Sequence, residues 1–442
     1  MVWPNMHGHW ELRFSPAIKP ACFPCRRAAF GLVFLPRMLT TAVQTYRKAY
    51  SGLSRSTWLL SLVMLINRSG TMVIPFMTLY LTSSHMGFSI AAAGVVFGMF
   101  GLGAFTGAYF GGRLTDRIGF YPVQLITLGG GGLLFIVLGQ MKSYGWICFF
   151  TYLLSFVNEA FRPANSTAIA YYSKEENRTR SYSLNRLAIN LGWAVGSGLG
   201  GMLAKVNYQL LFWVDGFTNL AAAVLMWMLL RPVNYRPAKP AGGELKQNHS
   251  AYRDRTYLAF IITTALFASC FFQLFTNLPV FYRSELHFSE PFIGLLMALN
   301  GILIALLEMV LIYSLEGRQS PTRYISIGVA VVGAAFLLLN LPRFSGAIAM
   351  SIMIVVTMGE ILSMPFMNSF WIGRSQSSNR GQYAALYTMA WSAAQCLGPL
   401  LGAQVADRFG FRVLWWVVGG LALLSAFSFA KLKTTRLDDP KQ

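Results

Sequence analysis

The stretch NEAFRPANS, residues 158–166, and the stretch GEILSMPFMNS, residues 359–369, carry the same polar pattern inside two long apolar segments. Each has a glutamate, then a proline, then an Asn-Ser pair. A carboxylate in the middle of a membrane-spanning helix is costly, and where it occurs a functional role is the first hypothesis. Finding one at matching places in both halves of the chain predicts a duplicated membrane protein with a polar path inside it, an organisation typical of transporters.

Composition agrees with a membrane protein. The chain has 442 residues, of which 55% are hydrophobic and only 12% charged, whereas about a quarter of the residues in a soluble domain are charged. So much apolar surface cannot be buried in one aqueous globule, so the chain is expected to cross a bilayer many times. The loops are short, and no hydrophilic block is long enough to form an attached catalytic domain.

Apolar runs of about twenty residues, the length that crosses a bilayer, occur six times before a polar stretch and six times after it. The expected spans are 57–82, 89–111, 122–141, 145–171, 181–204, 209–230, 256–282, 291–315, 322–341, 346–372, 381–405 and 412–431. The sequence thus predicts an all-α membrane protein with two six-helix bundles. The expected division is a disordered extension or unused upstream start at 1–37, a cytoplasmic amphipathic segment at 38–56, bundles at 57–230 and 256–431, a cytoplasmic linker at 231–255 and a cytoplasmic tail at 432–442.

Basic residues are distributed unevenly between the two sets of loops. From residue 38 onward, the N-terminal segment, the linker, the C-terminal tail and the loops on their side hold 22 Lys and Arg, and the opposite loops hold six. The positive-inside rule then places both termini and the linker in the cytoplasm of a multi-pass cell-membrane protein. This distribution also accounts for most of the net charge of +20 without a nucleic-acid partner.

Further correspondences between the halves support an internal duplication. An arginine precedes a glycine-rich run by eighteen residues in both halves, first Arg178 before 196–201 and later Arg380 before 398–403. Parallel repeats of this kind are one transporter pattern, with substrate bound near the middle of the membrane between the halves. We therefore expect the two bundles to be pseudo-symmetric.

The run GRLTDRIG, residues 112–119, lies between the second and third expected spans. It resembles the signature loop of the major facilitator superfamily, G-x-L-x-D-R-x-G, although Phe120 and Tyr121 replace the basic pair that usually follows. The resemblance implies the major facilitator fold with twelve transmembrane helices. It also implies a cytoplasmic gating loop in which the acidic residue and the arginines form a breakable latch, comprising Gly112, Arg113, Asp116, Arg117 and Gly119.

Within the superfamily the nearest resemblance is to the twelve-helix drug:proton antiporters. The run 192–201 is similar to their motif G-x-x-x-G-P-x-x-G-G but has Ser197 at the proline position. Proton-coupled peptide symporters carry E-x-x-E-R on the first span, and of that motif only Arg68 agrees. The resemblance implies proton-coupled export of small amphipathic or drug-like compounds. Two alternatives stay open: proton-coupled uptake of a small polar or anionic solute, peptide- or sugar-like, and a non-transporting membrane receptor on the same fold.

The resemblance to the major facilitator superfamily, in which the first and fourth spans both line the cavity, implies that three ionisable residues form one cluster in the first half. Arg68 and Glu159 lie centrally in their spans, and Glu159 and Arg162 share a helix face at spacing i, i+3. The cluster is either a permanent ion pair that holds the half together or a functional site. In a functional site, Arg68 or Arg162 binds an anionic substrate group, or releases Glu159 when Glu159 takes a proton.

Glu360 has no basic residue within a helical turn along the chain. A carboxyl group in an apolar span without such a neighbour holds a proton more readily, so Glu360 is the leading candidate for the proton carrier, with Glu159 and Glu308 as further candidates. Arg186 is expected to extend toward the cytoplasmic boundary, and Asp215 to be peripheral or structural.

Polar and aromatic residues in the spans complete the predicted substrate cavity, since amides suit hydrogen bonding in an enclosed site. The predicted cavity residues are Asn67, Arg68, Asn158, Arg162, Asn165, Gln273, Asn277, Asn300, Asn368 and Trp391. Nucleotide-binding and metal-binding motifs are lacking, which favours a transporter over an enzyme and predicts no cofactor and no metal. The expected partners are a small-molecule substrate, protons and the lipid bilayer, and the chain is expected to be monomeric.

Overall fold

The structure is a computed structural model that describes residues 52–174, 178–232, 250–315, 318–342, 344–375 and 380–432. These residues form helices and short connections, with no β-strand among them. The predicted extension 1–37 lies outside the described residues. So do most of the segment 38–56, most of the linker 231–255 and most of the tail 432–442.

We call residues 52–232 the first half and residues 250–432 the second half. The helices of the first half are α2 (Arg55–Ser69), α3 (Val73–Thr82), α4 (Ile90–Ile118), α5 (Phe120–Gly139), α6 (Tyr144–Tyr172), α7 (Arg178–Val206) and α8 (Gln209–Leu229). Those of the second half are η2 (Ala251–Arg253), α9 (Arg255–Phe271), η3 (Phe272–Leu274), α10 (Asn277–Ser284), α11 (Glu290–Leu315), α12 (Pro321–Leu338), α13 (Gly346–Arg374) and α14 (Arg380–Lys431).

The described helices make twelve membrane crossings. Ten helical stretches are long and apolar enough to cross a bilayer, with α2 and α3 forming one stretch and α9 to α10 another. One of the ten, within α14, contains a non-helical residue at Gly410 and so comprises two crossings. The twelfth is α6, whose 29 residues are long enough but include the polar stretch 158–166. The predicted all-α membrane fold of two six-helix bundles is confirmed.

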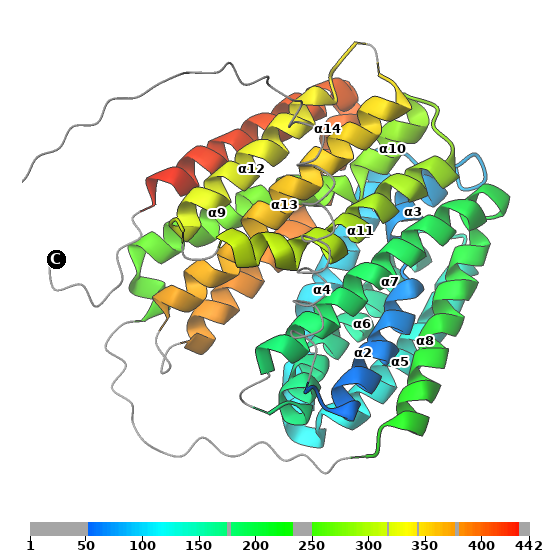
Figure 1. Ribbon diagram of the computed structural model, residues 1–442. Coiled ribbons are helices and arrows are strands. Elements are labelled where there is room, and N and C mark those ends of the chain that lie inside the picture. The colour runs from blue at the N-terminus through cyan, green and yellow to red at the C-terminus, as the bar shows by residue number, and fades with distance from the viewer. Residues whose placement is uncertain are drawn as a thin grey trace, which may run out of the picture. The chain divides into compact units, whose positions relative to one another are not determined.

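Helices of each half pack mainly on one another, and three pairs of helices join the halves. Figure 1 shows α2 to α8, in blue to green, beside α9 to α14, in green to red. The two most extensive joining pairs are α7 with α11 and α4 with α14, and α3 also contacts α10. We call the helix ends from which the linker leaves the linker side, and the other ends the opposite side. The joining pairs match the duplication, because the second and fifth helices of one half meet the fifth and second of the other.

The first span, expected over 57–82 and observed over Arg55–Thr82, is broken in the middle. Helix α2 ends at Ser69 and α3 begins at Val73. The carboxylate of Asp215, on α8, accepts hydrogen bonds from the backbone N–H of Met72 at 3.0 Å and of Val73 at 2.8 Å. Asp215 thus caps the new helix start, where the N–H groups have no partner within α3. The expected span 256–282 is broken in the same way, into α9, η3 and α10.

Two glycines join helices without an intervening loop. Gly119, between α4 and α5, has φ 88° and ψ 163°, and Gly410, inside α14, has φ 81° and ψ 164°. Glycine adopts such positive φ angles at no steric cost. Both glycines lie in the same short sequence, DRIGF at 116–120 and DRFGF at 407–411. The first turn is on the linker side and the second on the opposite side.

Glycines also let the halves approach closely at the seam between α7 and α11. A Cβ atom on Gly201 would lie 2.5 Å from the carbonyl oxygen of Glu290 and 3.0 Å from the Cα atom of Gly294. Small residues of this kind allow membrane helices to pack backbone against backbone. Gly201 and Gly294 lie toward the opposite side, so the halves are in direct contact there.

Candidate functional site

A cavity of about 250 Å³ lies between the two halves. Both halves contribute polar side chains to its lining, and aromatic rings fill much of the remaining wall. The polar lining residues include Arg68, Glu159, Arg162, Asn190, Asn300, Glu360 and Gln395, and the aromatic ones are Phe97, Phe100, Trp193, Phe272 and Phe275. One water needs roughly 10–15 Å³ of such space, so the cavity has room for a small organic molecule.

The first-half wall carries the three residues that the sequence placed in one cluster. Arg162 Nη2 lies 2.9 Å from Glu159 Oε2, one turn apart on α6. Arg68, near the end of α2, lines the same cavity. The Glu159 side chain is 12% exposed and that of Arg162 is 65% exposed, so the arginine extends into open space while its partner is largely enclosed.

Glu360 lies on the second-half wall, on α13. Asn300 of α11 donates a hydrogen bond from Nδ2 to Glu360 Oε2 at 3.0 Å, and the same nitrogen is 3.1 Å from Thr357 Oγ1. The structure therefore brings Asn300 and Glu360 together in the cavity, and it supplies Glu360 with an amide partner that sequence spacing could not reveal.

Arg186 does not extend to the membrane boundary as expected. Its guanidinium instead forms an ion pair with Glu308 of α11, with 3.0 Å between Nη2 and Oε2. This pair joins the two halves next to the cavity, and both of its members interact electrostatically with Glu360. Glu308, one of the three predicted proton carriers, is therefore already paired with a cation.

Asp215 is structural, as one of the two expectations had it, but it is not peripheral. Its side chain is fully buried and caps α3 as described above. Close by, Asn67 donates from Nδ2 to Asn219 Oδ1 at 2.8 Å. Asn67 and Asn158 line a side pocket of about 30 Å³ within the first half, which has room for about two waters. These two amides do not line the larger cavity, which shares Arg68, Thr71 and Ile74 with the side pocket.

Other predicted cavity residues hold helices together. Asn165 accepts a hydrogen bond from Gln124 at 3.3 Å and donates one to Asn185 at 3.4 Å, all buried within the first half. Gln273 donates to the Gly398 carbonyl at 2.7 Å and accepts from Asn277 at 2.6 Å. These buried amides stabilise helix packing, a common use of Asn and Gln in membranes.

Asn368 and Trp391 are also absent from the cavity lining. Asn368 Oδ1 accepts a hydrogen bond from Trp371 Nε1 at 3.2 Å, one turn along α13. Trp391 packs edge-on against Phe271 and Phe272, with ring centroids 6.3 and 6.0 Å away. Trp391 therefore supports the aromatic wall from behind, because Phe272 itself lines the cavity.

The predicted gating loop lies at the end of α4 on the linker side. Asp116 and Arg117 are exposed, and Arg113 stacks over the ring of Tyr109 at 4.3 Å. Within the described part of the chain no ion pair involves Asp116. Gly112 has open space around its Cα, whereas Gly119 makes the positive-φ turn. The latch role of these residues stays a prediction.

Sequence reasoning missed a group of polar residues on the opposite side. They line a hollow of about 610 Å³ between the halves. There Glu290 forms an ion pair with Arg283 at 3.2 Å and accepts a hydrogen bond from Tyr208 of the first half at 3.2 Å. Asp407 Oδ1 accepts a 3.4 Å hydrogen bond from the backbone N–H of Ala91, at the start of α4. The repeated DRxGF pattern could have drawn attention to Asp407.

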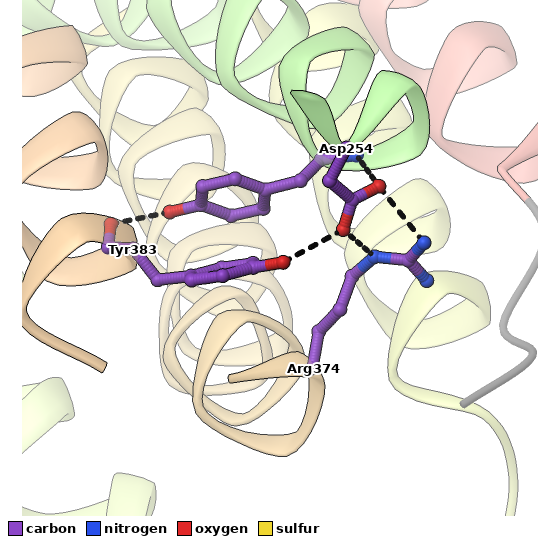
Figure 2. A network of polar contacts seen from close by, with 4 residues as sticks. Asp254, Arg374 and Tyr383 are labelled. Atoms are coloured by element: carbon purple, nitrogen blue, oxygen red, sulfur yellow. Dashed lines mark hydrogen bonds and ion pairs between the residues drawn. The ribbon is translucent and has the colours of Figure 1, made fainter. Parts of the chain in front are cut away.

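A second polar network joins three helices of the second half at the linker side. Figure 2 shows Asp254 bound by the Arg374 side chain and by the hydroxyl of Tyr383. The Arg374 Nη2 to Asp254 Oδ1 distance is 2.9 Å, as is that from Tyr383 Oη to Asp254 Oδ2. Burial alone would raise the pKa of Asp254, but the hydrogen bonds from Arg374, from the Tyr257 backbone and from Tyr383 outweigh it and hold that pKa below its usual value.

The sequence model of the Major Facilitator Superfamily matches residues 57–399, most of the chain. The chain belongs to the Major Facilitator Superfamily. It is therefore a multi-pass membrane transporter protein by family, and the resemblance seen in the 112–119 loop is confirmed at the level of the superfamily.

Several curated members of the Major Facilitator Superfamily are similar to the chain over most of its length. The MFS-type transporter YttB of Bacillus subtilis is 26% identical, over 88% of this chain and 96% of YttB. The tetracycline resistance protein, class D, of Salmonella ordonez is 22% identical, over 67% of this chain and 75% of that protein. The Na(+), Li(+), K(+)/H(+) antiporter of Planococcus maritimus is 23% identical, over 82% and 92%.

Solved structures of the superfamily share the fold at low sequence identity. A POT family transporter in complex with 5-aminolevulinic acid has a TM-score of 0.72 at 15% identity, covering 86% of this chain and 96% of that one. A mutant of the nucleoside transporter NupG has a TM-score of 0.70 at 14% identity, covering 86% and 100%. Identities this low establish the common fold alone.

Proposed function

We propose that the chain is a proton-coupled secondary transporter of small organic compounds, and that it exports them in exchange for protons. The observation that carries the proposal is the position of Glu360, which lines a cavity between two halves and has an amide rather than a cation as its hydrogen-bond partner. A carboxyl group placed in this way can alternate between protonated and charged forms as access to the cavity alternates.

Relatives support exchange with protons over other kinds of transport. They include tetracycline resistance proteins and a cation/proton antiporter by name. In our proposal Glu360 carries the proton, and Glu308, paired with Arg186, and Glu159, paired with Arg162, adjust the charge around it. By the positive-inside rule, the protein lies in the cell membrane with its linker side facing the cytoplasm.

Movement in this mechanism is a rocking of the two halves about the cavity. The described contacts that would have to part on the opposite side include the glycine seam at Gly201 and Gly294, the Tyr208–Glu290 hydrogen bond and the Asp407–Ala91 hydrogen bond. Their separation would open the cavity to that side while the linker side closes.

Purified protein in liposomes with an imposed pH gradient tests the proposal. We expect tetracycline, or another member of a panel of amphipathic compounds, to collapse the gradient when it is added, in the direction of proton–substrate exchange. Movement of protons in the same direction as the added substrate would identify proton-coupled uptake instead.

The variant Glu360→Gln should abolish this gradient-driven flux, and Glu285→Gln, at an exposed position outside the cavity, should leave it unchanged. Full flux in Glu360→Gln would refute the assignment of Glu360 as the carrier.

A further inference from the structure

Seven ionisable side chains lie well inside the membrane-spanning helices of the described chain, and five of them have a charged or backbone partner. Glu159 is paired with Arg162, and Glu308 with Arg186. Asp215 accepts the N–H groups at the start of α3. The two that remain are Arg68 and Glu360, which lie on facing halves and line the same cavity.

Arg68 is the uncompensated charge of the first-half wall. Among the described residues, no carboxylate lies within ion-pair distance of its guanidinium, and its Nε atom is buried without a hydrogen-bond partner. Glu159 acts on Arg68 electrostatically, but its carboxylate is already held by Arg162. The wall formed by Arg68, Arg162 and Glu159 therefore has a net charge of one positive unit.

Glu360 is the uncompensated charge of the second-half wall. The groups that act on it are Asn300 and Glu308 of α11 and Arg186 of α7. Arg186 is already paired with Glu308, so this pair adds no net charge. When Glu360 is ionised, the second-half wall is negative by one unit.

Apart from these charged groups and amides such as Asn190 and Gln395, the cavity wall is largely aromatic. The rings of Trp193 and Phe275 meet edge to face at 5.3 Å, and both line the cavity together with Phe97, Phe100 and Phe272. The Trp193 Nε1 donor is buried without a partner in the described structure. Uncompensated charges in such surroundings are strongly disfavoured, so a ligand that neutralises both of them gains binding free energy at two ends.

We propose that the substrates are dipolar organic molecules, in which an anionic group binds Arg68, a cationic group binds Glu360 and an apolar body lies between the aromatic rings. This inference rests on the proposed function and names the substrate class of the same cavity. It also explains exchange. An ammonium group and a proton compete for the Glu360 carboxylate, so binding of one releases the other, and the site never holds both.

A series of probes with one shared chain tests the class. We expect 6-aminohexanoate to raise the thermal unfolding midpoint of the purified full-length protein more than hexanoate or hexylammonium at equal concentration. The homologues 4-aminobutanoate and 8-aminooctanoate vary the separation of the two charges, and the best length measures the distance between Arg68 and Glu360. Equal effects of dipolar and singly charged probes at every length would overturn the proposal.

Two variants test which residue binds each charged end of the ligand. Glu360→Gln should weaken dipolar binding roughly tenfold or more and remove its advantage over hexanoate, since a hydrogen-bonded charge contact contributes about 1.5–3 kcal/mol. Arg68→Gln should remove the advantage over hexylammonium. The exposed Glu285→Gln and Arg253→Gln are the matched controls. A dipolar advantage that survives in both cavity variants would overturn the assignment.

Acidification gives a test on the unmodified protein, should a variant fail to fold. The advantage of the dipolar probe over hexanoate should shrink as pH falls, because protons occupy Glu360; a constant advantage would contradict competition at that carboxylate. The result is separable from the liposome assay. Dipolar selectivity without gradient-driven flux would refute proton coupling alone, and flux of singly charged compounds without dipolar selectivity would refute the substrate class alone.

Discussion

Arg186 of α7 and Glu308 of α11 form an ion pair across the two halves, with 3.0 Å between Nη2 and Oε2. The two partners differ in exposure. The Glu308 side chain is 7% exposed, whereas that of Arg186 is 43% exposed. If the pair is broken, Arg186 can still be solvated, but Glu308 is left as a buried charge without a cation. Loss of the ion pair therefore costs more free energy when Glu308 is the partner left behind than when Arg186 is.

This asymmetry predicts unequal effects of two neutralising substitutions. Arg186→Gln should lower the free energy of unfolding by about 3 kcal/mol, the range for stranding a buried charge, whereas Glu308→Gln should cost about 1 kcal/mol or less. Thermal unfolding of the purified variants in detergent measures the difference. The double variant should recover most of the loss of Arg186→Gln, and a larger loss in Glu308→Gln than in Arg186→Gln would contradict the assignment.

The fold could be predicted from the sequence because its signals are local. Apolar length, loop charge and the 112–119 loop each involve neighbouring residues. The break at Gly70 is different, because its causes lie on α8. A Cβ atom on Gly70 would collide with the Thr218 side chain, and Asp215 supplies the cap that makes a second helix start possible.

The candidate site could be predicted only in part, for the same reason. Glu159 and Arg162 pair within one helical turn, so their spacing revealed the contact. Arg186 and Glu308 are far apart in sequence, and nothing along the chain indicates that they meet. Amides such as Asn165 could not be assigned from residue type, since an Asn in a span serves packing as readily as substrate binding. Only the three-dimensional partners separate the two uses.

The Asp254 network predicts acid sensitivity at the linker side. Because the pKa of Asp254 is lowered in the folded protein, ionised Asp254 stabilises the fold above the pKa of the unfolded chain, about 3.9. That stabilisation is lost as pH falls through the lower folded pKa. Asp254→Asn should therefore be less stable than the unmodified protein at pH 7, and the difference between them should narrow toward pH 3.

Unfolding midpoints recorded between pH 7 and pH 3 measure this effect. Arg374 is 11% exposed in its side chain, so Asp254→Asn also removes a carboxylate from a largely enclosed guanidinium, and the loss at pH 7 should be about 3 kcal/mol. Asp116→Asn, at an exposed position on the same side, is the control and should change the midpoint little. A pH-independent difference for Asp254→Asn would exclude titration of this carboxyl group as the cause.

The seam between α7 and α11 predicts a shift in conformation on adding one methyl group. A Cβ atom on Gly294 would lie 2.5 Å from the Ser197 carbonyl oxygen, so Gly294→Ala should separate the halves on the opposite side. Spin labels at positions 205 and 287, in a background without native cysteines, should then report a longer distance. Gly145→Ala has no neighbouring atom to displace and should leave the distance unchanged, and an unchanged distance in Gly294→Ala would show that the seam does not govern closure.

The repeated DRxGF sequence predicts two substitutions with opposite effects. Asp407 accepts a hydrogen bond from the N-terminal turn of α4 in this conformation, and a carboxylate at a helix N-terminus contributes about 0.3–1 kcal/mol. Asp407→Asn should thus shift the equilibrium away from closure of the opposite side by roughly two- to fivefold.

Asp116, whose turn at Gly119 has the same geometry on the linker side, makes no ion pair within the described residues, so Asp116→Asn should not weaken this conformation. If Asp116 closes the linker side in the alternate state, its substitution should shift the same spin-label distance the other way. Equal shifts in one direction would refute the mirrored roles of the two aspartates.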